Sequence, residues 1–219
     1  MASFQLHNAS PNQPEIPTPL PKIFTLRTPP SCDAWRKPPS TNDFNAPFLV
    51  RTIALSSLRA ARVTVTAQWK TKFDQGGLLL VLPPHKKTDD RNHRSQRRWV
   101  KTGIEFFEGK PNISTVASDR WSDWSLAPLP EDSARKITIE LSREVANHEK
   151  TSTLWVHFVD PVSGNKRPLR EVAWVFEEEN LNGDGECEIG VYSAKPIRDE
   201  DDGEKELDVS FEDLIIEEW

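Results

Sequence analysis

Short stretches of alternating apolar and polar residues recur along most of this chain. From Arg62 to Trp69 the alternation is strict, with Val63, Val65 and Ala67 on one face and polar residues on the other. This period of two is typical of a half-buried β-strand. Residues 77–82 are continuously apolar after the first glycine, as expected for a strand covered on both faces. No long stripe has the 3.6-residue period of a helix.

Applied to the whole chain, the same pattern predicts about ten strands separated by turns, and therefore an all-β fold, either a sandwich or a barrel. The expected strands are residues 23–26, 62–69, 77–82, 98–107, 112–117, 136–141, 154–159, 172–176, 188–192 and 207–216. The first of these is expected at a sheet edge, since prolines stand on both sides of it.

The ends and loops of the chain differ from this pattern. Seven prolines fall in the first 30 residues, and proline has a fixed φ and no N–H to donate. We therefore predict a disordered arm over residues 1–22 and a single β-sandwich domain over 23–219, in keeping with the chain length. A basic loop at 83–97 and an acidic loop at 198–206 are expected to be solvated.

Composition and charge exclude several classes of protein. No run approaches the roughly 20 apolar residues that a membrane span needs. The net charge is −6, with −14 over residues 177–219 and +8 before them, which argues against a dedicated nucleic-acid binder. The two cysteines, Cys32 and Cys187, have no metal-ligand spacing. The first residues lack the basic start and the apolar stretch of a secretory signal, so none is expected. We predict a cytoplasmic protein without metal, cofactor, nucleic-acid or membrane partner.

The segment from Arg98 to Phe106 carries the main candidate binding residues. As a strand, it places Trp99, Lys101, Gly103 and Glu105 on one face and apolar residues on the other. One interpretation is a solvated row of charges on a sheet surface. The other is a binding face on which an aromatic ring and fixed charges contact a polar ligand.

Other candidate residues follow the same logic. Trp155 and His157 share one face of the strand at 154–159, where the histidine is either a satisfied buried residue or part of a ligand site. Asp74 and Gln75, followed by two glycines, are expected at the rim of a sheet. In the cluster from Trp121 to Ser125, Asp123 and Trp124 either stabilise a turn or form a sugar-like site, in which an indole covers the ring and a carboxylate accepts hydroxyl groups.

Six motifs follow one another along the chain, at residues 33–37, 73–78, 99–105, 122–125, 189–196 and 207–213. Their order resembles the "regulation of enolase" family, a family of unknown function in the concanavalin A-like lectin/glucanase superfamily. The resemblance covers about residues 24–216. The resemblance implies that the chain folds as a jelly-roll sandwich of two antiparallel sheets and that the protein is cytoplasmic. The family motif positions are Trp35, Asp74, Gln75, Trp99, Lys101, Glu105, Asp123 and Trp124. The family has no agreed catalytic set, so no catalytic residue is carried over.

Three hypotheses about function remain open at this point. The first is a sandwich without enzymatic activity that binds a carbohydrate-like metabolite or a protein partner and regulates sugar metabolism. The second is an enzyme of fungal secondary metabolism that promotes an addition or cyclisation by positioning a small molecule in an aromatic cleft. The third is a glycosidase that uses Glu105 and Asp123, although the paired acids of the superfamily's glucanases are missing.

Overall fold

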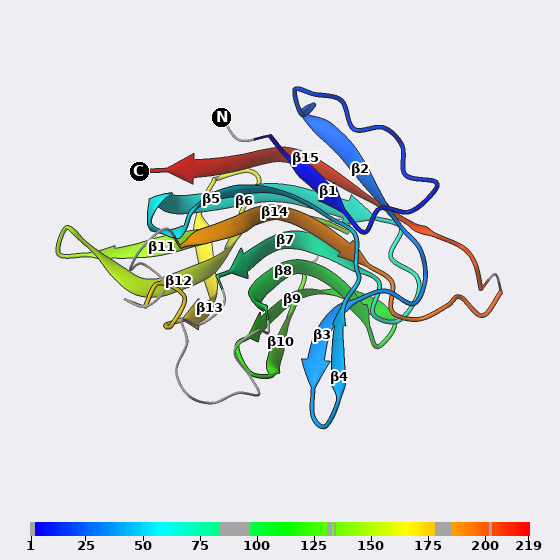
Figure 1. The fold of residues 1–219 in the computed structure, drawn as a ribbon. Coiled ribbons are helices and arrows are strands. Elements are labelled where there is room, and N and C mark those ends of the chain that lie inside the picture. The colour runs from blue at the N-terminus through cyan, green and yellow to red at the C-terminus, as the bar shows by residue number, and fades with distance from the viewer. Residues whose placement is uncertain (1–2, 84–96, 131–132, 134, 178–184, 202) are drawn as a thin grey trace.

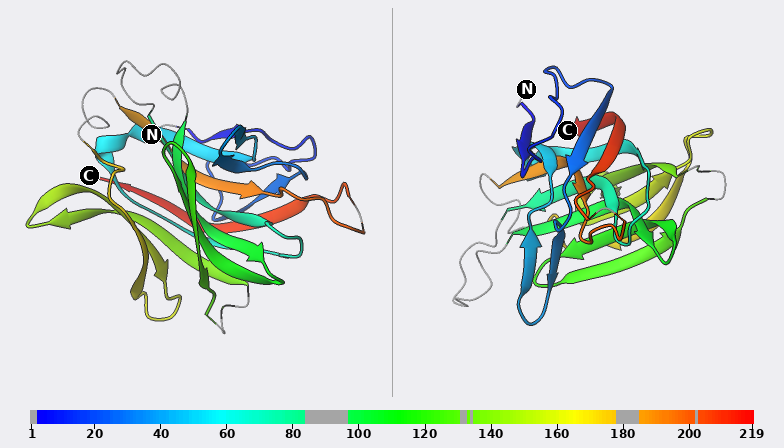
Figure 2. Two further views of the ribbon diagram at one scale, coloured as in Figure 1. Left: turned by 90° about the horizontal axis from the view of Figure 1, so that it is seen from below. Right: turned by 90° about the vertical axis from the view of Figure 1, so that its right-hand side faces the viewer.

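The computed structural model describes residues 3–83, 97–130, 133, 135–177, 185–201 and 203–219. Within these ranges, fifteen strands form two large sheets and one hairpin, joined by turns and by short 3₁₀ segments such as Leu55–Ser57 (Figure 1). The sheets curve and lie as two layers, as Figure 2 shows. The predicted sandwich of two antiparallel sheets is confirmed, and most of the predicted strands are present in longer form.

The larger sheet has seven antiparallel strands and carries the candidate site. In spatial order they are β1 (Gln5–His7), β5 (Phe48–Ala54), β14 (Glu186–Ala194), β7 (Gln75–Leu82), β8 (Arg98–Phe107), β9 (Lys110–Ser118) and β10 (Ser122–Pro128).

The second sheet has six strands and closes the other side of the core. Its spatial order is β13 (Lys166–Val172), β12 (Glu149–Val159), β11 (Lys136–Ala146), β6 (Leu58–Ala67), β15 (Leu207–Glu218) and β2 (Ile23–Thr28).

The hydrophobic core lies between the two sheets. Leu78 and Leu80 of β7 belong to the same buried cluster as Val63 and Val65 of β6. The apolar side chains of the alternating 62–69 stretch therefore face inward, as the sequence pattern indicated.

A second, smaller cluster lies on the outer face of the seven-stranded sheet. It is covered by the hairpin of β3 (Ala34–Lys37) and β4 (Thr41–Phe44), which projects beside β8–β10 in Figure 1. Leu79 and Val81 of β7 are buried there with Ala34 and with Phe44 packed at the margin. This explains why residues 78–82 of β7 are continuously apolar, since both faces of that part of the strand are covered.

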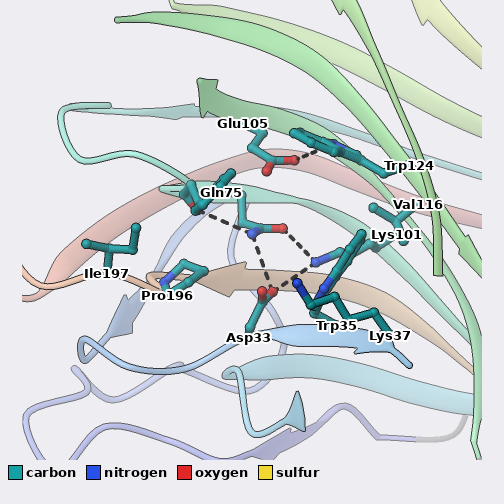
Figure 3. Close-up of a pocket in the computed structure, with 11 residues that line it drawn as sticks. Asp33, Trp35, Lys37, Gln75, Lys101, Glu105, Val116, Trp124, Pro196 and Ile197 are labelled. Carbon is teal, nitrogen blue, oxygen red and sulfur yellow. Dashed lines mark hydrogen bonds and ion pairs between the residues drawn. The ribbon is translucent and has the colours of Figure 1, made fainter. Parts of the chain in front are cut away.

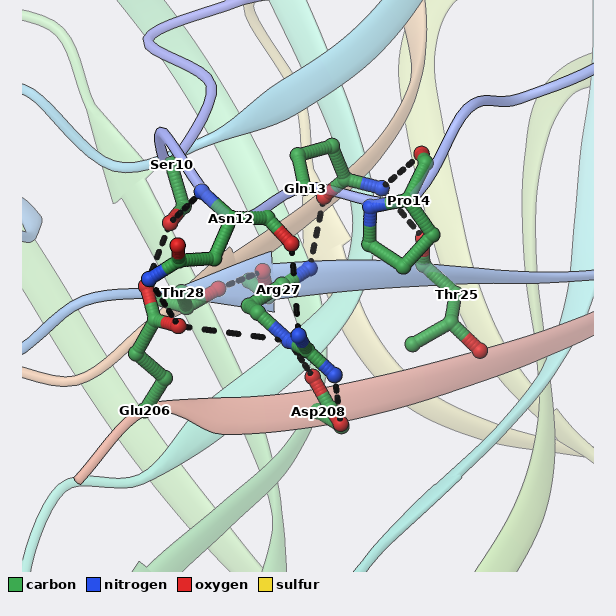
Figure 4. A network of polar contacts seen from close by, with 10 residues as sticks. Ser10, Asn12, Gln13, Pro14, Thr25, Arg27, Thr28, Glu206 and Asp208 are labelled. Carbon is green, nitrogen blue, oxygen red and sulfur yellow. Dashed lines mark hydrogen bonds and ion pairs between the residues drawn. The ribbon is translucent and has the colours of Figure 1, made fainter.

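Part of the arm that was predicted to be disordered is ordered. Residues 5–7 pair with β5 as β1, and the segment after them is held by side chains (Figure 4). The amide of Gln13 donates to the backbone oxygen of Thr25, while its oxygen accepts the N–H of Arg27. Ser10 donates to Glu206, the residue just before β15. Polar side chains stabilise this segment where proline prevents a regular backbone ladder.

Three further points differ from the expectations. The strand expected at 172–176 is mostly a turn, in which Val175 and Phe176 are buried in the core, and the strand lies just before it as β13. The short strands of the hairpin, the long β5 and β10 were not predicted, and β10 is extended where a turn around Asp123 and Trp124 was one of the two interpretations. The acidic segment 198–206 is not wholly solvated, because Asp199 is buried. The basic segment, except for its ends at Pro83 and Arg97, lies outside the described residues.

Candidate functional site

A pocket of about 300 Å³ opens on the outer face of the seven-stranded sheet, beside the β3–β4 hairpin (Figure 3). Its walls come from the hairpin, from β7 to β10, and from the segment after β14. The lining residues are Asp33, Trp35, Lys37, Phe73, Gln75, Lys101, Glu105, Val116, Trp124, Pro196 and Ile197. Of the ten sequence candidates, Trp35, Gln75, Lys101, Glu105 and Trp124 meet here.

The floor beside the pocket contains a pair of glycines without side chains. Gly77 of β7 and Gly103 of β8 face one another across the strands, and a Cβ on Gly103 would lie 2.0 Å from the backbone oxygen of Gly76. No other residue type permits this close approach. The pair leaves a bare strip of backbone between Lys101 on one side and Glu105 on the other.

Lys101 extends along this strip and is almost fully buried, with 2% of its surface exposed. Its Nζ donates to Gln75 Oε1 at 2.8 Å and to Asp33 Oδ1 at 3.0 Å (Figure 3). The Tyr192 hydroxyl donates to the same Gln75 oxygen at 3.2 Å. Burial raises the pKa of Tyr192 well above its usual value, so its hydroxyl keeps its proton. The buried ammonium group is thus paired and hydrogen-bonded, as its burial requires.

Glu105 is the second buried charged group of the pocket, with 4% of its surface exposed. Its Oε2 accepts hydrogen bonds from Ser114 Oγ at 2.6 Å and from Trp124 Nε1 at 3.0 Å. Burial raises the pKa of this carboxyl above 4.5, although the nearby Lys101 and these hydrogen bonds act in the opposite direction. Glu105 is therefore an oriented carboxyl group that holds a proton more readily than a solvated glutamate.

Aromatic rings form the walls around these polar groups. The Trp35 and Trp124 rings meet edge to face with centroids 6.4 Å apart, and Phe73 lies 6.3 Å from Trp124. Phe107 packs against both Phe73 and Trp124 and supports them from outside the pocket. Such edge-on contacts fix the ring orientations, so the indoles provide rigid apolar walls.

A buried ion cluster holds together the two segments that form the wall at Phe73 and Pro196. Lys195 Nζ lies 2.9 Å from Asp199 Oδ1 and 3.3 Å from Asp74 Oδ1. The other oxygen of Asp74 accepts the backbone N–H of Thr71 at 2.8 Å. Asp74 therefore lies outside this pocket, where it positions its neighbours, Phe73 and Gln75, and it lines a different cavity with Lys195 and Asp199.

Trp99 does not line the pocket, contrary to the expectation. It is fully buried under the hairpin, where the Arg36 guanidinium lies 4.6 Å from its ring centroid and Phe44 packs at 5.1 Å. The face assignment was right, because Trp99 is on the same side of β8 as Lys101. What the sequence pattern did not reveal is that the hairpin covers this end of the strand.

The structure also separates Asp123, Trp155 and His157 from the pocket. Asp123 precedes Trp124 on β10 and so points to the opposite face, where it pairs with Arg170 and lines a different cavity. Trp155 and His157 lie on the other sheet, and Trp155 donates to Glu144 at 3.1 Å. Glu105 and Asp123 therefore line different cavities, and the hypothesis of a glycosidase that uses these two carboxyl groups together is wrong.

Several lining residues were missed by the sequence analysis. Asp33 lies in the family motif at residues 33–37 but was not among the predicted site residues, although it supplies the carboxylate partner of Lys101. An isolated bridge between Cys32 and Lys195 brings Asp33 to the sheet. This long-range contact has no local signal in the sequence. Lys37, Phe73, Val116, Pro196 and Ile197 were missed for the same reason.

The part of the chain that the structure describes has neither a metal-ligating cluster nor a membrane-spanning helix. There, no group of three or more histidine, cysteine, aspartate or glutamate side chains is arranged to hold a metal ion. In the same residues, no helix has the length and apolar character to cross a membrane.

Comparison with known sequences gives a family and two relatives. Residues 12–219 match the model of a family described as a protein of unknown function, DUF1349. An uncharacterised protein of Emericella nidulans is 43% identical over 217 residues, or 99% of this chain and 96% of that protein. Regulation of enolase protein 1 of Saccharomyces cerevisiae is 29% identical over 135 residues, or 58% of this chain and 61% of that protein.

Solved structures share the fold. A functionally unknown protein from Saccharomyces cerevisiae aligns with a TM-score of 0.70 at 20% identity, over 99% of this chain and 97% of that one. The Bacteroides ovatus xyloglucan PUL protein GH43B aligns with a TM-score of 0.54 at 17% identity, over 91% of this chain but 34% of that one. An alginate lyase from Klebsiella pneumoniae aligns with a TM-score of 0.51 at 10% identity, over 96% of this chain and 86% of that one. These structural matches confirm the sandwich fold, while the family model and the yeast relative confirm the resemblance that the motifs indicated.

Proposed function

This chain belongs to the DUF1349 family, and from the geometry of its pocket we propose that it binds a small, neutral, carbohydrate-like metabolite. The observation that carries the proposal is that Trp35 and Trp124 flank the polar groups of Lys101 and Glu105 in a single small cavity. Apolar walls with a few convergent polar groups are the usual features of a small-molecule site.

The charges in the pocket favour a neutral ligand. Two cations, Lys37 and Lys101, stand beside two carboxyl groups, Asp33 and Glu105, and Lys101 is already paired with Asp33. A ligand with a net charge would upset this balance next to the buried Lys101 and Glu105. A sugar offers hydroxyl groups to the polar residues and an apolar ring face to the indoles.

The names of similar proteins agree with this ligand class. The yeast relative is named for regulation of enolase, and the Bacteroides ovatus structure is named for xyloglucan. We extend the proposal to a role for the bound metabolite in regulating sugar metabolism in the cytoplasm. Both cysteines are buried and unpaired, which is consistent with a reducing compartment.

The experiment is saturation-transfer NMR with D-xylose, L-arabinose, D-glucose and D-xylulose. We expect transfer to the C–H protons of at least one sugar, and at least a tenfold loss of affinity in Trp35→Ala. Trp155→Ala is the matched control, because Trp155 is also half-buried but lies on the other sheet. Absence of transfer from all four sugars, or equal losses in the two variants, would count against the proposal.

A further inference from the structure

The two oxygens of the Glu105 carboxyl group have different surroundings. Oε2 is held by Ser114 and Trp124, whereas Oε1 has no hydrogen-bond partner among the described residues. Glu105 lines the pocket, so the unshared oxygen is the one available to a ligand. The two donors fix the orientation of the carboxyl group, as an acid or base in catalysis requires.

Lys101 provides a matching donor. An ammonium group has three N–H bonds, and Gln75 and Asp33 accept two of them. The third remains for a ligand atom in the pocket that Lys101 also lines. Because Gln75 pairs directly with Glu105 across the strands, the Lys101 ammonium reaches the neighbourhood of the carboxyl group.

The pocket thus combines an oriented carboxyl group and a fixed cation within aromatic walls. A base and a hydrogen-bond donor at separate points of one small cavity can act on two adjacent atoms of a ligand. The almost complete burial of Lys101 and Glu105 strengthens electrostatic interactions with developing charge, because little water screens them.

We propose that this pocket enolises an open-chain hydroxyketone, a ketose sugar, with Glu105 as the base and Lys101 as the donor to the carbonyl oxygen. The inference rests on the proposed function, since the sugar must first bind in the same pocket. It adds a reaction and a narrower substrate class to that function.

The reaction needs no other reactant. Glu105 Oε1 takes the proton from the carbon beside the carbonyl, the C–H electron pair forms the C=C bond, and the carbonyl π pair moves onto oxygen. Lys101 stabilises the resulting enediolate by donating a hydrogen bond to that oxygen. Glu105 then returns a proton to the same carbon or, as the neighbouring hydroxyl proton passes to the enediolate oxygen, to the former carbonyl carbon. When the carboxyl proton has first exchanged with solvent, the first outcome is isotope exchange at that carbon. The second outcome is isomerisation.

The pKa of Glu105 is consistent with this role. Burial raises it above the ordinary 4.5, which brings it closer to neutral pH. A group that both takes up and returns a proton works best when its pKa lies near the working pH.

The experiment follows deuterium incorporation into D-xylulose in D₂O by proton NMR, with saturation transfer measured on the same samples. D-Xylulose is suitable because a ketopentose cannot close a six-membered ring through its carbonyl, so the open-chain ketone is well represented. We expect the protein to accelerate exchange at the carbons beside the carbonyl. The Glu105→Gln variant should still bind the sugar, but its exchange rate should fall by roughly 10²- to 10⁴-fold. Trp155→Phe is the control and should match the unmodified protein.

The outcomes separate the two proposals. Binding of D-xylulose without exchange above the buffer rate overturns the enolisation and leaves the proposed function standing. The same holds if another sugar of the panel binds and D-xylulose does not. Equal exchange by Glu105→Gln and the unmodified protein removes Glu105 as the base. No binding of any sugar of the panel overturns both proposals.

Discussion

Lys101 Nζ lies 2.8 Å from Gln75 Oε1, although the residue opposite Lys101 on β7 is Leu79. The lysine side chain therefore extends along the strand by two same-face positions. Gly77 and Gly103 occupy the position between them. Their missing side chains leave the space that the contact needs, so the glycine pair is part of the pocket's architecture.

Replacing Gly103 by alanine should therefore destabilise the protein by about 2–3 kcal/mol, because the added Cβ would lie 2.0 Å from a backbone oxygen. Urea unfolding measures the change. Gly203→Ala is the control, since a Cβ there meets only the end of the Arg198 side chain, at 4.0 Å, and should alter stability by less than about 0.5 kcal/mol. Similar losses in both variants would show that the close approach at Gly103 is not the cause.

Stability should depend on pH through Glu105. Its folded-state pKa is raised above 4.5, so the folded state holds the proton more tightly than the unfolded state. Stability is then lost as the pH rises from about 4.5 through the folded pKa, by about 1.4 kcal/mol for each pH unit between the two pKa values. Glu105→Gln removes this dependence and should gain stability relative to the unmodified protein over that range.

Unfolding curves measured between pH 4 and 8 check this expectation. Asp74, whose pKa is also raised by burial, is present in both proteins and cancels in the difference. A constant difference between the two proteins across the pH range would contradict the assignment to Glu105.

Most strands of the two sheets were predictable from the sequence because they carry their own apolar pattern, as β6 and β11 do. The hairpin strands, β5 and β10 were not. The pocket was only partly predictable. Lys101 and Glu105 could be assigned to one face of β8 from their spacing alone. The burial of Trp99 depends on a hairpin more than 50 residues earlier in the chain, and the contact of Asp33 with Lys101 spans 68 residues. Local periodicity contains no information on such contacts.

The buried ion cluster behind the pocket wall should contribute strongly to stability. Lys195→Met leaves the carboxyl groups of Asp74 and Asp199 without their buried cation, and we expect a loss of about 3–5 kcal/mol. Thermal unfolding measures it. The double variant Lys195→Met/Asp199→Asn should lose less stability than the sum of the losses in the two single variants. Strict additivity would show that the three groups are not coupled.

Trp99 and Trp35 should differ in what their substitution changes. Trp99→Phe shortens a fully buried side chain under Arg36 and should cost about 1–3 kcal/mol of stability, with sugar affinity changed less than twofold. Trp35→Phe removes part of a half-buried pocket wall and should mainly weaken binding. Titration and unfolding of both variants check this. A larger loss of sugar affinity in Trp99→Phe than in Trp35→Phe would show that Trp99 contributes to the binding site.

The central claim is that Glu105 and Lys101 face a ligand inside the aromatic pocket. Carbon-13 NMR of the glutamate carboxyl groups, with Glu105 assigned through Glu105→Gln, tests it most directly when D-xylulose is titrated into the protein. We predict a carboxyl resonance that titrates above the ordinary glutamate range and shifts as the sugar binds. A Glu105 resonance that titrates like an exposed glutamate and does not move at the highest sugar concentration would contradict the claim.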